Sequence, residues 1–96
     1  MSENDIRFED GPKGRYVIDM PNGEKSLLTF MRNGDNHIVI DHTFVPPTYR
    51  GKGHAERLVK RAIGDARASG TKITPTCWYV AAEFRRHPEW ADLLKS

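Results

Sequence analysis

Hydrophobic residues alternate with polar ones through the first half of the chain, a period of two that is typical of half-buried β-strands. The alternating runs occupy residues 6–8, 16–20, 26–32 and 37–45. Glycine, asparagine or proline residues that favour tight turns stand between them. Pro46 and Pro47 end the fourth run, because proline has no N–H to donate to a neighbouring strand. The pattern predicts four strands joined by short turns into an antiparallel meander.

The spacing of apolar positions changes in the second half of the chain. Apolar residues now recur at steps of three and one, the stripe of an amphipathic helix, at Ala55, Leu58, Val59, Ala62, Ile63 and Ala66. Gly70 ends this helix, since glycine suits a left-handed C-terminal cap. A fifth strand interrupted by Pro75 is predicted over 71–79, and short helices over 80–86 and 88–94. The order strand, helix, strand implies a right-handed parallel crossover that places the fifth strand beside the fourth.

These elements predict an α/β (α+β) fold, in which one long helix and two short C-terminal helices accompany a mostly antiparallel five-stranded sheet. A length of 96 residues leaves room for one core, so residues 1–96 are expected to form a single domain. The lone cysteine, Cys77, excludes a disulfide scaffold. No apolar run approaches the length of a membrane span, and residues 1–5 lack a signal-peptide pattern. We therefore expect a cytoplasmic protein without a membrane partner.

Two glycines, Gly51 and Gly53, stand between the last strand of the meander and the long helix. Glycines at such a place let several backbone N–H groups converge where the helix dipole is positive, which favours a bound phosphate. Arg50 and Lys52 add positive charge. The segment lacks the Gly-Lys-Ser/Thr ending of a nucleotide-binding P-loop. It predicts a phosphate site, and a plain glycine-rich start of a helix is the alternative.

The segment Arg50-Gly51-Lys52-Gly53-His54-Ala55 resembles the acetyl-coenzyme A pyrophosphate loop of the GNAT acetyltransferase superfamily. Three further segments make the chain similar to the short branch called YjdJ-type: His42-Thr43-Phe44-Val45-Pro46, Pro75-Thr76-Cys77 and Arg86-His87-Pro88-Glu89-Trp90. The match runs from about the first strand to Leu94. The resemblance implies a reduced GNAT-like fold and acetyl transfer from acetyl-coenzyme A to an amine, carried by a small molecule or a protein.

The resemblance also implies which residues bind the acetyl donor. The pyrophosphate site would comprise Arg50, Gly51, Lys52, Gly53, His54 and Ala55. The backbone of Phe44 and Val45 would pair with the pantetheine arm as an added strand does. Pro75 supplies a reason for this, because it cannot donate to the fourth strand and so lets the two strands splay. A simple bulge in an edge strand is the other interpretation of Pro75.

Cys77 and His42 are the candidate catalytic residues. Cys77 follows Pro75 by two residues and precedes a predicted helix, whose N-terminus lowers a thiol pKa. The thiolate could accept the acetyl group before an amine does, although direct attack by the amine stays open. His42 could act as general base, with a pKa suited to neutral pH. The alternative for each is a core residue, and alternation places His42 on the side of Ile38, Ile40 and Phe44.

The histidines and tryptophans give weaker indications of function. The four histidines, His37, His42, His54 and His87, have no metal-ligand spacing, so no metal site is expected. His54 is expected to flank the phosphates, and Trp78 and Trp90 to serve as packing anchors.

Two rival functions stay open at this stage. A coenzyme A-binding module without turnover is the first. Phe44 stands where many relatives have Glu, and nothing between Phe8 and Tyr16 corresponds to the acceptor-binding helices of larger GNAT enzymes. A nucleic-acid domain is the second, and it would use the basic residues Arg50, Lys52, Arg57, Lys60, Arg61 and Arg67. The net charge of only +2 and the absence of interleaved aromatic residues disfavour it.

Overall fold

The computed structural model describes residues 5–95. The strands are β1 (Ile6–Glu9), β2 (Lys13–Asp19), β3 (Lys25–Arg32), β4 (His37–Phe44) and β5 (Lys72–Pro75). The helices are α1 (His54–Ser69) and α2 (Trp78–Arg86), with short 3-10 turns η2 (Pro47–Tyr49) and η3 (Pro88–Leu93). The predicted fold class is confirmed. Most of the N-terminal stretch used to argue against a signal peptide lies outside the described residues.

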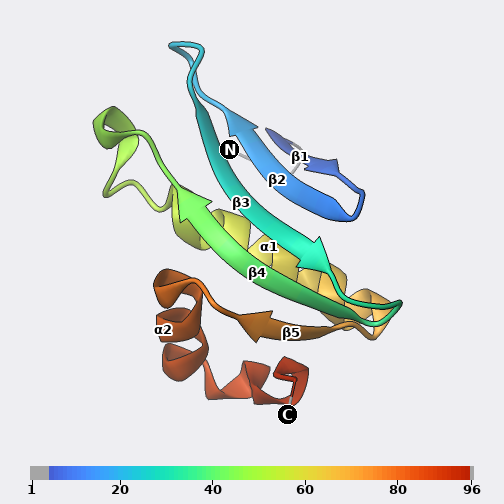
Figure 1. The fold of residues 1–96 in the computed structure, drawn as a ribbon. Coiled ribbons are helices and arrows are strands. Elements are labelled where there is room, and N and C mark those ends of the chain that lie inside the picture. The colour runs from blue at the N-terminus through green and yellow to red at the C-terminus, as the bar shows by residue number, and fades with distance from the viewer. Residues whose placement is uncertain (1–4, 96) are drawn as a thin grey trace.

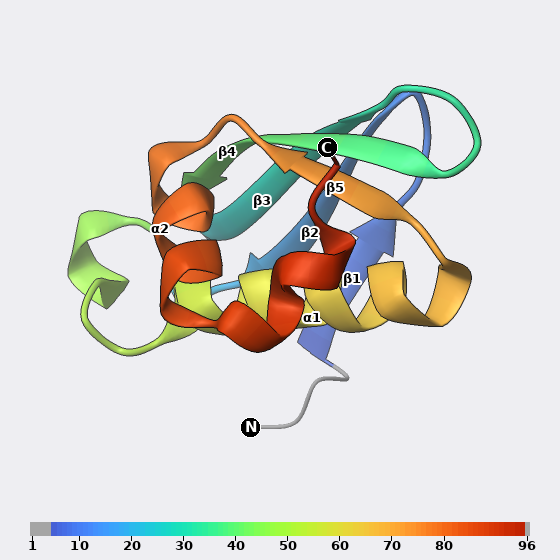
Figure 2. The same cartoon turned by 90° about the horizontal axis from the view of Figure 1, so that it is seen from below.

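The five strands form one sheet in the order β1-β2-β3-β4-β5. The first three pairings are antiparallel, and β4 pairs with β5 in parallel. α1 provides the crossover between these two strands and lies across one face of the sheet, as Figure 1 shows. α2 and the C-terminal turn lie on the same side of the sheet (Figure 2). The meander and the parallel crossover are therefore confirmed.

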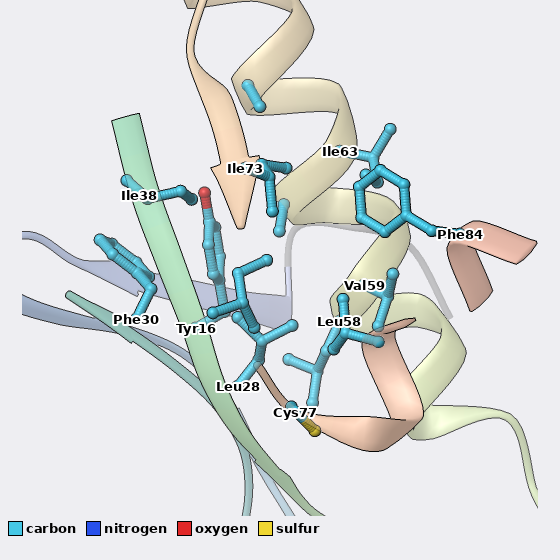
Figure 3. Close-up of a cluster of buried hydrophobic side chains, with 14 of the residues drawn as sticks. Tyr16, Leu28, Phe30, Ile38, Leu58, Val59, Ile63, Ile73, Cys77 and Phe84 are labelled. Carbon is cyan, nitrogen blue, oxygen red and sulfur yellow. The ribbon is translucent and has the colours of Figure 1, made fainter. Parts of the chain in front are cut away.

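The hydrophobic core lies between α1 and the sheet (Figure 3). α1 contributes the buried residues Leu58, Val59, Ala62, Ile63 and Ala66. The sheet contributes large buried side chains such as Leu28, Phe30, Ile38, Ile40 and Ile73. The helical stripe predicted from spacing is thus the buried face, apart from the partly exposed Ala55 at its start. This packing places the end of β4 close to the start of α1, and both line one groove.

A β-bulge interrupts the pairing of β3 with β4. Thr29 is opposite His42, but the next residue, Phe30, is opposite Ile40, so Asp41 is an extra residue in β4. A bulge of this kind reverses the alternation of side chains beyond it. His42 is consequently exposed and lies on the face opposite to Ile40. The prediction that His42 shares the core side with Ile38 and Ile40 is wrong, because a strict period of two was extended through the bulge.

The fifth strand is shorter than predicted. It ends at Pro75, and α2 starts at Trp78 instead of Val80. The amides of Thr76 and Cys77 both donate to the carbonyl oxygen of Ile40, at 3.0 and 3.2 Å, and no later residue continues the pairing. The prediction that Pro75 parts the strands by withholding an N–H from β4 is wrong, because its nitrogen lies on the outer edge of β5, as does the Ile73 carbonyl that accepts from Lys95. The pairing ends because the chain turns into α2 directly after Cys77. Figure 1 shows β4 running on past the end of β5 while the chain turns away into α2.

Candidate functional site

The turn before α1 has the geometry of an anion site. Gly51 and Gly53 have φ values of 81° and 83°, in the left-handed region that favours glycine. Gly53 is the N-cap of α1, and no side chain caps the helix. The first amides of a helix have no partner within it, so those of His54 and Ala55 are available to a ligand. A Cβ added at either glycine would meet no atom within 4 Å, which leaves the backbone open to close approach.

A groove of about 610 Å³ connects this turn with the end of β4 and the start of α2. Seven of the predicted donor-binding residues line it: Phe44, Val45, Arg50, Gly51, Gly53, His54 and Ala55. Lys52 is exposed in the same turn but does not line the groove. Five lining residues were missed in the sequence: Thr43, Tyr49, Glu56, Trp78 and Tyr79. The structure therefore brings the predicted phosphate turn and the end of β4 into one site.

Charge at the mouth of the groove is mostly positive. The Arg50 Nε donates to the carbonyl oxygen of Val45 at 2.9 Å, and its guanidinium lies 5.9 Å from the centre of the Phe44 ring. Arg50 is thus held along the groove wall. The one acidic residue in the first turn of α1, Glu56, is paired with Lys60 at 3.5 Å. The helix N-terminus and Arg50 therefore favour an anionic ligand.

His54 presents a polar atom that lacks a partner in the protein. Its Nδ1 is buried and makes no hydrogen bond. The ring meets Tyr49 edge-on, with a centroid distance of 6.3 Å. Buried polar atoms are normally satisfied, so an orphaned one in the wall of a groove fits a ligand atom. The expected place of His54 beside the phosphates stays a prediction.

Cys77 adjoins the groove without lining it. The residue is 8% exposed, lies at the edge of the buried cluster in Figure 3 and forms the N-cap of α2. The hydroxyl oxygen of Thr43 is 3.3 Å from its sulfur. Burial raises the pKa of the Cys77 thiol, but the Thr43 hydroxyl and nearby backbone amides, including those of Tyr79 and Val80, outweigh burial. The pKa of Cys77 therefore lies below the ordinary thiol value, which favours a reactive thiolate.

The aromatic residues near the groove differ from each other. Trp90 is buried and stacks on His87 at a centroid distance of 4.0 Å, as expected of a packing anchor. Trp78 is 79% exposed and lines the groove, so its prediction as a packing anchor is wrong. Burial and the nearby carboxylates Glu83 and Glu56 raise the pKa of Tyr79, so its hydroxyl keeps its proton at neutral pH.

The other sequence interpretations can also be located. Within residues 5–95, no group of three or more His, Cys, Asp or Glu side chains is placed to hold a metal ion. No helix in that range combines the length and apolarity needed to cross a membrane. The basic residues of α1 are largely paired with acids: Arg57 with Asp5, Lys60 with Glu56, Arg61 with Asp65 and Arg67 with Asp92. This pairing argues against a nucleic-acid surface along α1.

Comparison with known proteins decides the family. Residues 15–93 match the family model described as GCN5-related N-acetyl-transferase. The chain belongs to the GCN5-related N-acetyltransferase (GNAT) family. Its general activity is acetyl transfer, and the resemblance identified in the sequence is confirmed at the level of the family. The matched stretch contains the whole groove and Cys77.

Relatives of this GNAT chain include vertebrate proteins. Protein NATD1 of Homo sapiens is 31% identical over 85 residues, which cover 86% of this chain and 75% of the human protein. Protein NATD1 of Danio rerio is 31% identical over 93 residues, which cover 93% of this chain and 84% of its own. A GCN5-like protein from Staphylococcus aureus, solved by NMR, superposes with a TM-score of 0.68 at 24% identity, covering 100% of this chain and 92% of that one. This last likeness supports the fold.

Proposed function

We propose that this GNAT domain transfers an acetyl group from acetyl-coenzyme A to an amine acceptor and that the groove holds the donor. One observation carries the proposal. A single groove of about 610 Å³ joins an uncapped helix N-terminus to the place where β4 and β5 part, next to a thiol of lowered pKa. A thioester that also carries phosphates needs an anion site and, at some distance from it, a reaction centre. The N-terminus of α1 is proposed as the anion site, and the region beside Cys77 as the reaction centre.

The pyrophosphate is assigned to the turn before α1. The backbone amides of 51–55 are proposed to bind it there, the positive end of the helix dipole adds attraction, and Arg50 and Lys52 add charge. His54 is proposed to flank the phosphates, and its unpartnered Nδ1 supports this assignment. Glycine is required at position 53, since its φ of 83° is strained for other residues. The donor is thus held mainly by main-chain groups of this turn.

The pantetheine arm is assigned to the part of β4 that β5 leaves unpaired. Pairing with β5 stops at Ile40, and β4 continues to Phe44. The amide of Thr43 helps to lower the pKa of Cys77, which supports its facing the gap. Successive amides of a strand point to opposite edges, so Val45 shares this direction and Phe44 contributes its ring to the groove wall. The proposed contact is therefore made by the backbone of 43–45, which includes the predicted Phe44 and Val45.

Cys77 is proposed to accept the acetyl group. Its thiolate attacks the thioester carbonyl, a new carbon–sulfur bond forms, and the coenzyme A thiolate leaves and takes up a proton. Tyr79 lines the groove and can pass a proton to the leaving thiolate, and the proton released by the amine in the second step restores its hydroxyl. The lone pair of the acceptor amine then attacks the acetyl-Cys77 carbonyl, which frees the Cys77 thiolate and releases a proton. One thioester replaces another in the first step, so neither sulfur is oxidised or reduced.

His42 lies exposed on the face of the sheet that α1 does not cover, whereas Cys77 belongs to the core cluster on the α1 side. His42 is therefore not proposed as the base for an amine that attacks acetyl-Cys77. Direct attack of the amine on the donor is the competing route, in which Cys77 only shapes the pocket. The protein is further proposed to act in the cytoplasm. Its acceptor amine is proposed to belong to a small molecule or to a protein.

A coenzyme A-binding module without turnover is the second candidate function, favoured by Phe44 at a position where a carboxylate base would be expected. Calorimetric titration with acetyl-coenzyme A tests donor binding in both cases. Release of free coenzyme A in the presence of a panel of polyamines, amino acids and lysine peptides then separates them. Binding with amine-dependent release supports the enzyme, binding without release supports the module, and absence of binding contradicts both.

A further inference from the structure

Thr43 lies between the groove and Cys77. It lines the groove, is half-buried, and its hydroxyl oxygen is 3.3 Å from the Cys77 sulfur. We propose that Thr43 is a positioning residue whose hydroxyl donates to the Cys77 thiolate and holds the sulfur toward the groove. This inference rests on the proposed function, in which that sulfur takes the acetyl group. A neutral thiol can donate to the same oxygen, so the contact persists while the proton is exchanged.

The bulge at Asp41 is what gives Thr43 this place. Without an extra residue, position 43 would lie on the opposite face from Ile40, because side chains alternate along a strand. The bulge reverses that order, and Thr43 is paired with the fully buried Leu28 on the side of α1. Bulges beside active sites commonly re-aim one side chain. Here the side chain that is turned inward carries a hydroxyl, and it meets the one thiol of the chain.

The surroundings of the sulfur leave Thr43 as the main side chain acting on it. Burial raises the pKa of Cys77, and the Thr43 hydroxyl is the largest contribution that lowers it, ahead of the amides at the start of α2. The Cys77 side chain does not form an N-cap hydrogen bond with the first amides of α2. The main causes of the shift of the Cys77 pKa are burial and hydrogen bonds, and none of them is a charged side chain. The carboxylates Glu56 and Glu83 act on the neighbouring Tyr79 instead.

The test compares thiol ionisation in wild type, Thr43→Val and Thr43→Ser. The rate of Cys77 alkylation by iodoacetamide is measured against pH without donor. Thr43→Val keeps the shape and removes the hydroxyl, so the rate near neutral pH should fall about tenfold, the effect of losing one hydrogen bond to a charged group. The plateau rate at high pH should be unchanged. Thr43→Ser restores a hydroxyl and should return the profile close to that of wild type.

Thr74→Val is the matched control, since the Thr74 hydroxyl bonds to His37 at 2.6 Å and not to the thiol. Its profile should equal wild type. Should Thr43→Val lose its circular dichroism signal, Thr43→Ala replaces it with the same expectation. A profile for the folded variant equal to wild type overturns the role of Thr43, whether or not Cys77 is acetylated. Absence of acetyl-Cys77 in wild type, with the Thr43→Val shift present, instead removes the thiol intermediate from the proposed function.

Discussion

The carbonyl oxygen of Ile40 accepts a hydrogen bond from the amide of Cys77 at 3.2 Å, at the point where β4 and β5 separate. This single contact ties the candidate nucleophile to the strand that borders the groove. Within residues 5–95, β4 forms no further strand pairing with β5 beyond Ile40, and α2 begins directly after Cys77. The sulfur is therefore held by the same backbone that opens the gap for a ligand.

Gly53→Val should weaken coenzyme A binding beyond its effect on folding. Valine at a φ of 83° is strained by about 1–2 kcal/mol, and its side chain would point into open space at the phosphate turn. Gly70→Val is the matched control, because Gly70 caps the other end of α1 with a φ of 72° and also has open space around it. Thermal unfolding should shift similarly for both, whereas calorimetry should show lost affinity only for Gly53→Val. Equal affinities would place the phosphate elsewhere.

Gly14→Ala should destabilise the core. A Cβ at Gly14 would lie 2.2 Å from the Cζ atom of Phe30, whose ring is buried. Overpacking of this kind costs about 1–3 kcal/mol in the free energy of unfolding, measured by urea titration. Gly64→Ala, at an exposed position of α1 with no atom within 4 Å, should instead stabilise by about 0.5–1 kcal/mol. Phe30→Leu in the Gly14→Ala background should recover part of the loss. A fully stable Gly14→Ala would contradict the contact.

Stability should fall in acid partly through Asp19. Hydrogen bonds from Arg7 and Lys25 lower the pKa of Asp19 to about 2. A carboxylate with a lowered pKa in the folded state adds stability above its unfolded value of about 4, and that contribution disappears as pH falls toward 2. Urea unfolding of wild type and Asp19→Asn at several pH values between 2 and 6 checks this. The difference between the two should shrink as pH drops through this window, and a constant difference would show that the ion pairs do not matter.

The strand and helix order could be predicted because it depends on local patterns. Alternation, turn residues and the apolar stripe of α1 each reflect burial against one core. The phosphate turn was also accessible, since two glycines before a helix carry a local conformational signal, and both indeed have positive φ.

The rest of the site depends on contacts that no local pattern contains. The extra residue Asp41 carries no sequence mark, yet it decides that Thr43 and not His42 turns toward the core side. Tyr49 and Tyr79 are 30 positions apart in the sequence, and only the tertiary fold makes both line one groove. Trp78 resembled a core residue by type, but the early start of α2 leaves it in solvent.

Cys77→Ser should separate binding from chemistry. Serine is similar in size but is a poor nucleophile at neutral pH, so coenzyme A affinity should persist while acetyl transfer to an amine is lost. Nearly normal transfer would favour direct attack by the amine. Thr76→Ser, an adjacent exposed position whose hydroxyl bonds to the carbonyl oxygen of Ile40, should leave both binding and transfer unchanged.

Mass spectrometry of the wild-type protein after incubation with acetyl-coenzyme A tests the central proposal most directly. The account predicts an acetyl group on Cys77, labile to hydroxylamine as a thioester is, and much less of it on Gly53→Val at the same donor concentration. It also predicts that desulfo-coenzyme A, which fills the groove without reacting, slows the labelling. An unmodified Cys77 at saturating donor, with donor binding confirmed by calorimetry, would contradict the proposal that this thiol receives the acetyl group.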